Sequence, residues 1–176
     1  MLLGSKMPAE LDLFRTLKML LVHDLVEVYA GDTRVYDTLV RKIDDGELMY
    51  DATKIANKME REELAASKLF SILPEDLHDD FQGLFTEFEQ VRTLEAKIAK
   101  VLDKIHPLLQ SSVTDGKDYK ECQSTYRGEM QLVKKHIDRL PEECQPIFVS
   151  MVTQLLDDAQ KRGWLVNEES KGVVVA

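Results

Sequence analysis

The chain has 176 residues, of which 44% are hydrophobic and 31% charged, and its net charge is −9. This length fits one compact domain with a substantial core. The acidic charge excludes duplex nucleic acid as the main ligand, because binding to a phosphate backbone depends on clustered lysine and arginine. No apolar run reaches the roughly 18 to 20 residues of a membrane span, and the Met1-Leu2-Leu3 start lacks the charged region of a signal peptide.

The two cysteines, Cys122 and Cys144, form no CxxC pair and have no histidine at ligand spacing. They therefore indicate neither a zinc finger nor a disulfide framework. A reducing, cytoplasmic location is the expectation for such a chain.

The first predicted element is a helix of about 20 residues that begins at Pro8, since proline suits a first helical position. Its apolar residues recur at three- and four-residue steps: Leu11, Phe14, Leu17, Leu21, Leu25 and Val28. Around Met19 to Val22 the helix is hydrophobic on nearly all sides, so we expect another surface to cover it.

Ionisable side chains interrupt this apolar helix in the segment KMLLVHDLVEVYAGDT. His23, Asp24 and Glu27 lie three or four positions apart and share one side of a helix, Gly31 fits a left-handed cap, and Asp32 follows it. A buried carboxylate beside a buried imidazole is costly unless the groups are paired or bind a metal, so the segment is a candidate metal site. The alternative is a solvated helix end with its histidine near the negative end of the helix dipole.

The rest of the chain is predicted to be helical apart from residues 31–50, the longest irregular stretch, which we interpret as a lid or binding loop. No segment shows the alternation of a strand. Further helices are predicted for residues 52–72, 74–90, 93–110, 119–139 and 142–162, with Gly163 as a cap and Trp164-Leu165 folded back on the core. The expected domain covers residues 1–166, and residues 167–176 form a flexible tail.

A second acid, Asp103, stands on the helix that Thr93 caps and that ends near Pro107 to Gln110. It follows Ala96 and Ala99 at two-turn and one-turn spacing. Small residues allow another helix to approach closely. This is the setting in which an aspartate can meet ligands from a distant segment.

Three segments together resemble the HD-domain metal-dependent phosphohydrolase family. They are KMLLVHDLVEVYAGDT (18–33), MEREELAASKLFSILPEDL (59–77) and LFTEFEQVRTLEAKIAKVLDKIHPLLQ (84–110), with a weaker continuation in QKRGWL (160–165). The closest in character are single-domain HD proteins similar to 5'-deoxynucleotidases. The resemblance implies an all-α HD-domain bundle of about six helices and a phosphatase for a small phosphate monoester such as a (deoxy)nucleoside 5'-monophosphate.

By this resemblance, His23 and Asp24 are metal ligands and Asp103 is the distal ligand. Glu27 matches the acid that handles the attacking water, and Asp32 matches an acid on the substrate side of the pocket. The implied cofactor is a divalent ion (Mn, Co, Fe, Ni, Zn or Mg), and mixed nitrogen and oxygen ligation favours the transition metals among these.

The chain departs from the family at one position, because no histidine precedes His23 and the motif requires one upstream. Met1-Leu2-Leu3 followed by Gly4 reads like the last turn of a helix and its cap. We therefore expect that the chain is N-terminally truncated, or has naturally lost this histidine, and that it covers its exposed apolar face as a homodimer. The competing hypothesis is a catalytically impaired HD-fold remnant or a helical interaction protein without a complete metal site.

Several other residues have two interpretations. His106 is either a further ligand or a surface side chain at a helix end, and the second is favoured, while His78 and His136 are expected to be solvated. Glu62 lies either near the pocket or on an exposed charged helix face. Lys100 and Lys104 either contact phosphate or pair with nearby acids such as Glu95.

Overall fold

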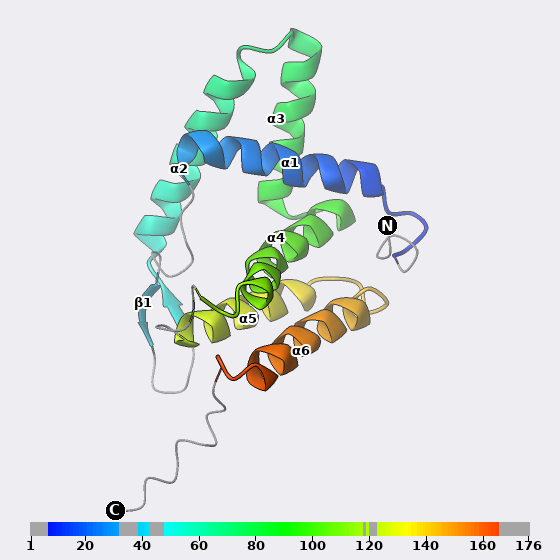
Figure 1. Ribbon diagram of the computed structural model, residues 1–176. Helices are drawn as coiled ribbons and strands as arrows, with labels where there is room; N and C mark the ends of the chain where they lie inside the picture. The colour runs from blue at the N-terminus through cyan, green and yellow to red at the C-terminus, as the bar shows by residue number, and fades with distance from the viewer. Residues whose placement is uncertain (1–6, 32–38, 43–47, 118, 120–122, 166–176) are drawn as a thin grey trace, which may run out of the picture. The chain divides into compact units, whose positions relative to one another are not determined.

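The computed structural model describes residues 7–31, 39–42, 48–117, 119 and 123–165. Within these ranges it contains six helices, which confirms the all-α class, and one short hairpin. The elements are α1 Leu13–Ala30, β1 Leu39–Lys42, β2 Leu48–Tyr50, α2 Ala52–Phe70, α3 Glu75–Gln90, α4 Leu94–Val113, α5 Gln123–Ile137 and α6 Gln145–Lys161 (Figure 1). Among the described helices, none combines the length and apolar character needed to cross a membrane.

Two compact units make up the chain, and the boundary lies within α4. The N-terminal unit consists of residues 9–100, and the C-terminal unit contains the described residues from Val101 onward. In the N-terminal unit α1 packs against both α2 and α3, and Figure 1 shows it crossing this helical pair. The buried apolar core of this unit comprises Met19, Val22, Val26, Ala66, Phe70, Leu84, Phe85, Phe88, Ala96 and Ala99. This core fixes α1, the helix that carries the candidate metal site.

The start of α1 differs from the prediction. The helix begins at Leu13 rather than at Pro8, because the Asp12 side chain accepts a hydrogen bond of 2.8 Å from the Arg15 N–H and caps it. At the other end, the Gly31 N–H donates to the Glu27 carbonyl. Gly31 has a φ of 80°, which confirms the positive φ of a glycine cap, but its ψ of 127° is not left-handed helical.

The prediction that residues 31–50 are irregular is wrong for the two strands. β1 and β2 pair in an antiparallel manner, with Leu39 opposite Tyr50 and Lys42 opposite Leu48. The sequence carried a hairpin signal, since Asp45-Gly46 stands between two short runs with strand-forming residues. Residues 32–38 and 43–47, on which the lid interpretation mainly rests, lie outside the described residues.

The predicted end of the Asp103 helix is also wrong. α4 continues through Pro107 to Val113. A proline inside a helix removes one backbone hydrogen bond, and here Ile105 and Leu108 on either side of it are fully buried, so packing holds the helix together. The predicted start is confirmed, because the Thr93 hydroxyl accepts a hydrogen bond of 3.2 Å from the Ala96 N–H.

In the C-terminal unit α5 packs against α6. α5 ends at Ile137, two residues before the predicted end, and residues 120–122, at its predicted start, lie outside the described residues. α6 begins three residues later and ends one residue earlier than predicted. Gly163 has a φ of 73° and its N–H donates to the Gln160 carbonyl, as expected for a cap. Trp164 and Leu165 are buried, which confirms that they fold back, and the Trp164 ring meets the Tyr126 ring at a centroid distance of 4.9 Å. The predicted flexible tail lies outside the described residues.

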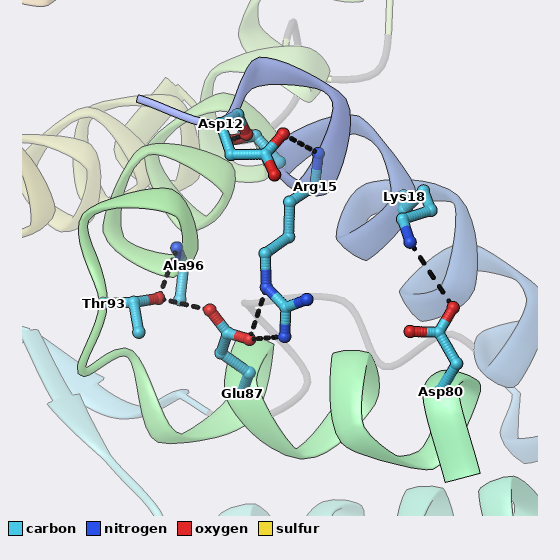
Figure 2. A network of polar contacts seen from close by, with 8 residues as sticks. Asp12, Arg15, Lys18, Asp80, Glu87, Thr93 and Ala96 are labelled. Carbon is cyan, nitrogen blue, oxygen red and sulfur yellow. Dashed lines mark hydrogen bonds and ion pairs between the residues drawn. The ribbon is translucent and has the colours of Figure 1, made fainter. Parts of the chain in front are cut away.

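A polar network ties α1 to α3 and to the start of α4 (Figure 2). Arg15 Nε donates to Glu87 Oε2 at 2.9 Å, and the Thr93 hydroxyl donates to Glu87 Oε1 at 2.6 Å. Burial raises the pKa of the Glu87 carboxyl, but the hydrogen bonds from Arg15 and Thr93 outweigh it and leave this pKa below its usual value of 4.5. The charged form of Glu87 therefore stabilises the folded state.

We expect Glu87→Gln to lower the free energy of unfolding at pH 7 by about 1 kcal/mol, the size of one partly exposed charge-assisted contact. The pKa of the Glu87 carboxyl is lower in the folded state than in the unfolded state. The stabilisation is therefore fully present at pH values above the unfolded-state pKa, and it is lost as the pH falls through the folded-state pKa. Urea unfolding at pH 7 and at pH 3 checks this, and the difference between variant and wild type should shrink at pH 3. Asp80→Asn is the matched control, since the Lys18–Asp80 pair, at 3.4 Å, has both side chains more than a third exposed. An equal loss in both variants would contradict the expectation.

Candidate metal centre

Three ionisable side chains gather on the last turns of α1. His23, Asp24 and Glu27 each offer a ligand atom, and these atoms all lie within 4.8 Å of one another. The helical period causes this, because positions three and four apart stand on one side of a helix. The side chains differ in environment: His23 is buried, Glu27 is half-buried and Asp24 is exposed.

His23 is 1% exposed, so the alternative of a solvated histidine at the helix end is wrong. Its Nε2 lies 3.3 Å from Glu27 Oε1, and its Nδ1 lies 3.9 Å from Glu89 Oε1 on α3. The ring stacks at a tilt on Phe88, with a centroid distance of 4.3 Å. The imidazole is thus fixed by packing, with a carboxylate near each of its nitrogens.

Each of these two carboxylates also has a lysine. Lys58 Nζ, from α2, lies 3.6 Å from Glu27 Oε1. Lys100 Nζ, from α4, lies 2.9 Å from Glu89 Oε1 and 3.9 Å from the centroid of the Phe88 ring. Sequence reasoning missed both Lys58 and Glu89. Their only signal was helical spacing to neighbouring acids and bases, which is common on exposed helices.

The structure shows the surroundings of the residues for which the sequence allowed two interpretations. Glu62 is 2% exposed, so its interpretation as part of an exposed helix face is wrong, and its Oε1 lies 3.2 Å from Lys58 Nζ. Lys100 pairs with Glu89 rather than with Glu95, whose carboxylate accepts a hydrogen bond from the Asp12 N–H. His106 is exposed, as favoured for a surface side chain. His78 and His136 are only partly exposed.

Asp103 belongs to the C-terminal unit. Its side chain is 17% exposed, and its Oδ2 lies 2.8 Å from Lys104 Nζ. Lys104 therefore pairs with this neighbouring acid. The role of Asp103 as the distal metal ligand stays a prediction from the sequence, and Asp32 lies outside the described residues.

The side chains on α1 fit a divalent ion. One imidazole and two carboxylates within 4.8 Å form a mixed nitrogen and oxygen donor set, and such a set suits Mn, Co, Fe, Ni or Zn. The buried imidazole is already held in place, which lowers the cost of ordering the ligands around an ion. This arrangement can bind a metal and can keep a carboxylate beside it.

Comparison with known proteins identifies similar sequences and a similar solved structure. Residues 1–144 match the family model described as the HD domain. The chain is 34% identical over 98 residues to the 5'-deoxynucleotidase HDDC2 of Bos taurus (56% of this chain, 41% of that protein) and 30% identical over 106 residues to that of Homo sapiens (60% and 45%). These matches span less than half the length of either relative.

A crystal structure of a predicted metal-dependent phosphohydrolase from Magnetospirillum magnetotacticum MS-1 is also similar, with 30% sequence identity and a TM-score of 0.63. The alignment covers 94% of this chain and 75% of that protein.

Proposed function

The chain belongs to the HD domain family, and from that premise we propose that it is a metal-dependent phosphohydrolase acting on a (deoxy)nucleoside 5'-monophosphate. The observation that carries the proposal is the cluster of His23, Asp24 and Glu27, which places metal-binding groups and a further acid within 4.8 Å. The substrate class is supported by the similarity to proteins named 5'-deoxynucleotidase.

In this proposal His23 and Asp24 hold the divalent ion, and Asp103 is added as the third ligand on the sequence argument. When bound, such an ion lowers the pKa of a coordinated water and offsets charge on the phosphoryl oxygens. His23 contributes a nitrogen donor whose ring is fixed against Phe88. The buried ring cannot swing away, so the ligand geometry is preorganised.

Glu27 is proposed to act as the general base. Its Oε1 lies 3.3 Å from His23 Nε2, so the carboxylate stands next to the ligand position and is close enough to take a proton from the attacking water. The water oxygen then forms a bond to phosphorus while the bond from phosphorus to the ester oxygen breaks, and the released oxygen takes up a proton from solvent to become the sugar hydroxyl. Asp32 is proposed to position that ester oxygen or the sugar.

Trace-element analysis of the purified protein, followed by phosphate release from a panel of nucleoside monophosphates, tests this function. Bound metal together with turnover of one or more deoxynucleoside monophosphates is the expected result. A folded helical protein with neither metal nor turnover would instead support the alternative, a remnant or interaction protein.

We also propose that the protein is a homodimer that pairs through α1. Large apolar side chains on this helix are exposed: Leu13, Phe14, Leu17, Leu21, Leu25, Val28 and Tyr29. Contiguous apolar surface of this kind usually marks an interface, and a standard one buries roughly 800 Å² per partner.

Leu21→Lys should therefore shift the protein from dimer to monomer in analytical ultracentrifugation, because it places a charge within the pairing face. Ile72→Lys is the control, since Ile72 is a 76% exposed apolar residue that lies outside α1, beyond the end of α2. A wild-type protein that is monomeric at roughly 100 µM would contradict the proposal, because this concentration is far above the dissociation constants of stable dimers.

The proposed compartment is the cytoplasm. Its support is the absence of a disulfide framework in the sequence, where Cys122 and Cys144 have no paired spacing. Cys144 is buried.

A further inference from the structure

Lys58 connects the candidate metal centre to a buried acid on α2. Its Nζ lies 3.2 Å from Glu62 Oε1 and 3.6 Å from Glu27 Oε1. The second of these oxygens is also the one that lies 3.3 Å from His23 Nε2. A chain of charged groups therefore runs from Glu62 through Lys58 and Glu27 to the imidazole.

Glu62 fixes the position of the Lys58 ammonium. The Glu62 side chain is 3% exposed and that of Lys58 is 20% exposed. A buried carboxylate requires a close cation, because an isolated buried charge is strongly unfavourable. One helical turn separates Glu62 from Lys58, so the pair forms within α2. The ammonium is consequently held at Glu27 by an interaction that does not depend on Glu27.

This arrangement bears on what Glu27 does, because its position allows two roles. By distance alone it could be a third metal ligand on α1, since it belongs to the cluster that lies within 4.8 Å. If a carboxylate oxygen that faces an ammonium also binds a divalent ion, the two cations lie close together and repel each other. This repulsion disfavours metal binding by that oxygen. The Lys58 ammonium lies at the same oxygen that faces His23.

We propose that Lys58, anchored by Glu62, is a positioning residue that keeps Glu27 out of the metal ligand set and available as the base. This inference rests on the proposed function, since it assigns the division of roles within that same site. Lys58 acts through Glu27 and has no contact with the reacting atoms in this assignment.

Four variants test the inference by Co²⁺ titration, the visible spectrum of bound Co²⁺ and steady-state kinetics. Lys58→Met removes the cation, and Lys58→Met with Glu62→Gln removes the cation and the buried charge together. Lys58→Arg retains the cation. Lys68→Met is the matched control, since Lys68 is an exposed lysine on the same helix. The double variant keeps the test valid if the single variant does not fold, because no buried charge is left without a counter-ion.

The expected result is a fall in kcat of about 10- to 100-fold in both Lys58→Met proteins, the usual effect of losing a group that orients a metal site. KM should stay within about two-fold, because substrate binding is not affected. Co²⁺ affinity should not fall, and the Co²⁺ absorption should weaken as Glu27 joins the ligands and coordination number rises. Lys58→Arg should recover most of the turnover, and Lys68→Met should match the wild type.

If the wild type binds metal and turns over substrate, any of three results would overturn the inference about Lys58 without affecting the proposed function. Full turnover in the double variant would mean that Lys58 serves only as the counter-ion of Glu62. A raised KM with unchanged kcat would mean that Lys58 binds the substrate phosphate. An unchanged Co²⁺ spectrum in both Lys58→Met proteins would mean that Glu27 does not move. A wild-type protein that binds no Co²⁺ would instead overturn the proposed function, and this inference with it.

Discussion

Glu27→Gln is expected to lower kcat by roughly two to four orders of magnitude while the metal content of the protein stays nearly unchanged. The substitution retains the shape of the side chain but removes the carboxylate that would accept the proton of the attacking water. The metal should remain, because in this account Glu27 lies beside the ligands and is held there by Lys58 at 3.6 Å. Metal analysis and phosphate release on the same preparation measure both quantities.

The control for this variant is Glu63→Gln, an exposed acid on α2. It should retain both metal and turnover. If Glu27→Gln lost metal to the same extent as a ligand variant, Glu27 would be a ligand and the division of roles would be wrong. A variant with full turnover would show that another group takes the proton.

His23→Asn should abolish turnover through loss of the metal itself. The imidazole is the only nitrogen donor of the cluster on α1. Loss of a residue that supports a ligand lowers metal affinity by roughly 10- to 100-fold, and loss of the ligand itself should lower it at least as much. Asp24→Asn should have the same effect, and so should Asp103→Asn, because Asp103 is the third ligand proposed from the sequence. Metal titration followed by calorimetry measures the affinity.

Because His23 is 1% exposed, its variant could also lose stability. Thermal unfolding followed by circular dichroism separates the two effects, since Asp24 is exposed and Asp24→Asn should lose metal with little change in Tm. His106→Asn, at an exposed histidine of α4, should change neither metal binding nor Tm. A His23→Asn protein that keeps its metal would contradict the ligand assignment.

The sequence was most informative where a pattern is local. The six described helices were all predicted, the first of them from its three- and four-residue apolar repeat, and helical spacing alone placed His23, Asp24 and Glu27 on one side of α1. Capping chemistry located Thr93 and Gly163 correctly, because one or two residues determine such a cap. These features depend on neighbours within one or two helical turns.

The features that the sequence did not predict depend on contacts between elements. The position of Lys58 beside Glu27 results from the packing of α2 against α1. The burial of Glu62 likewise could not be predicted from its neighbours in the sequence, because the surrounding segment MEREE is highly charged. The continuation of α4 beyond Pro107 reflects packing that outweighs an unfavourable residue. The hairpin was missed for a different reason, since its Asp45-Gly46 signal was present but was assigned to a loop.

Anomalous diffraction from crystals grown with Mn²⁺ will show whether the C-terminal end of α1 is a catalytic metal centre. We expect a peak within roughly 2.0 to 2.3 Å of ligand atoms of His23 and Asp24, with Asp103 as a further ligand and with Glu27 outside bonding distance. A peak bound by other residues, or none at these side chains in a crystal of active protein, would contradict it.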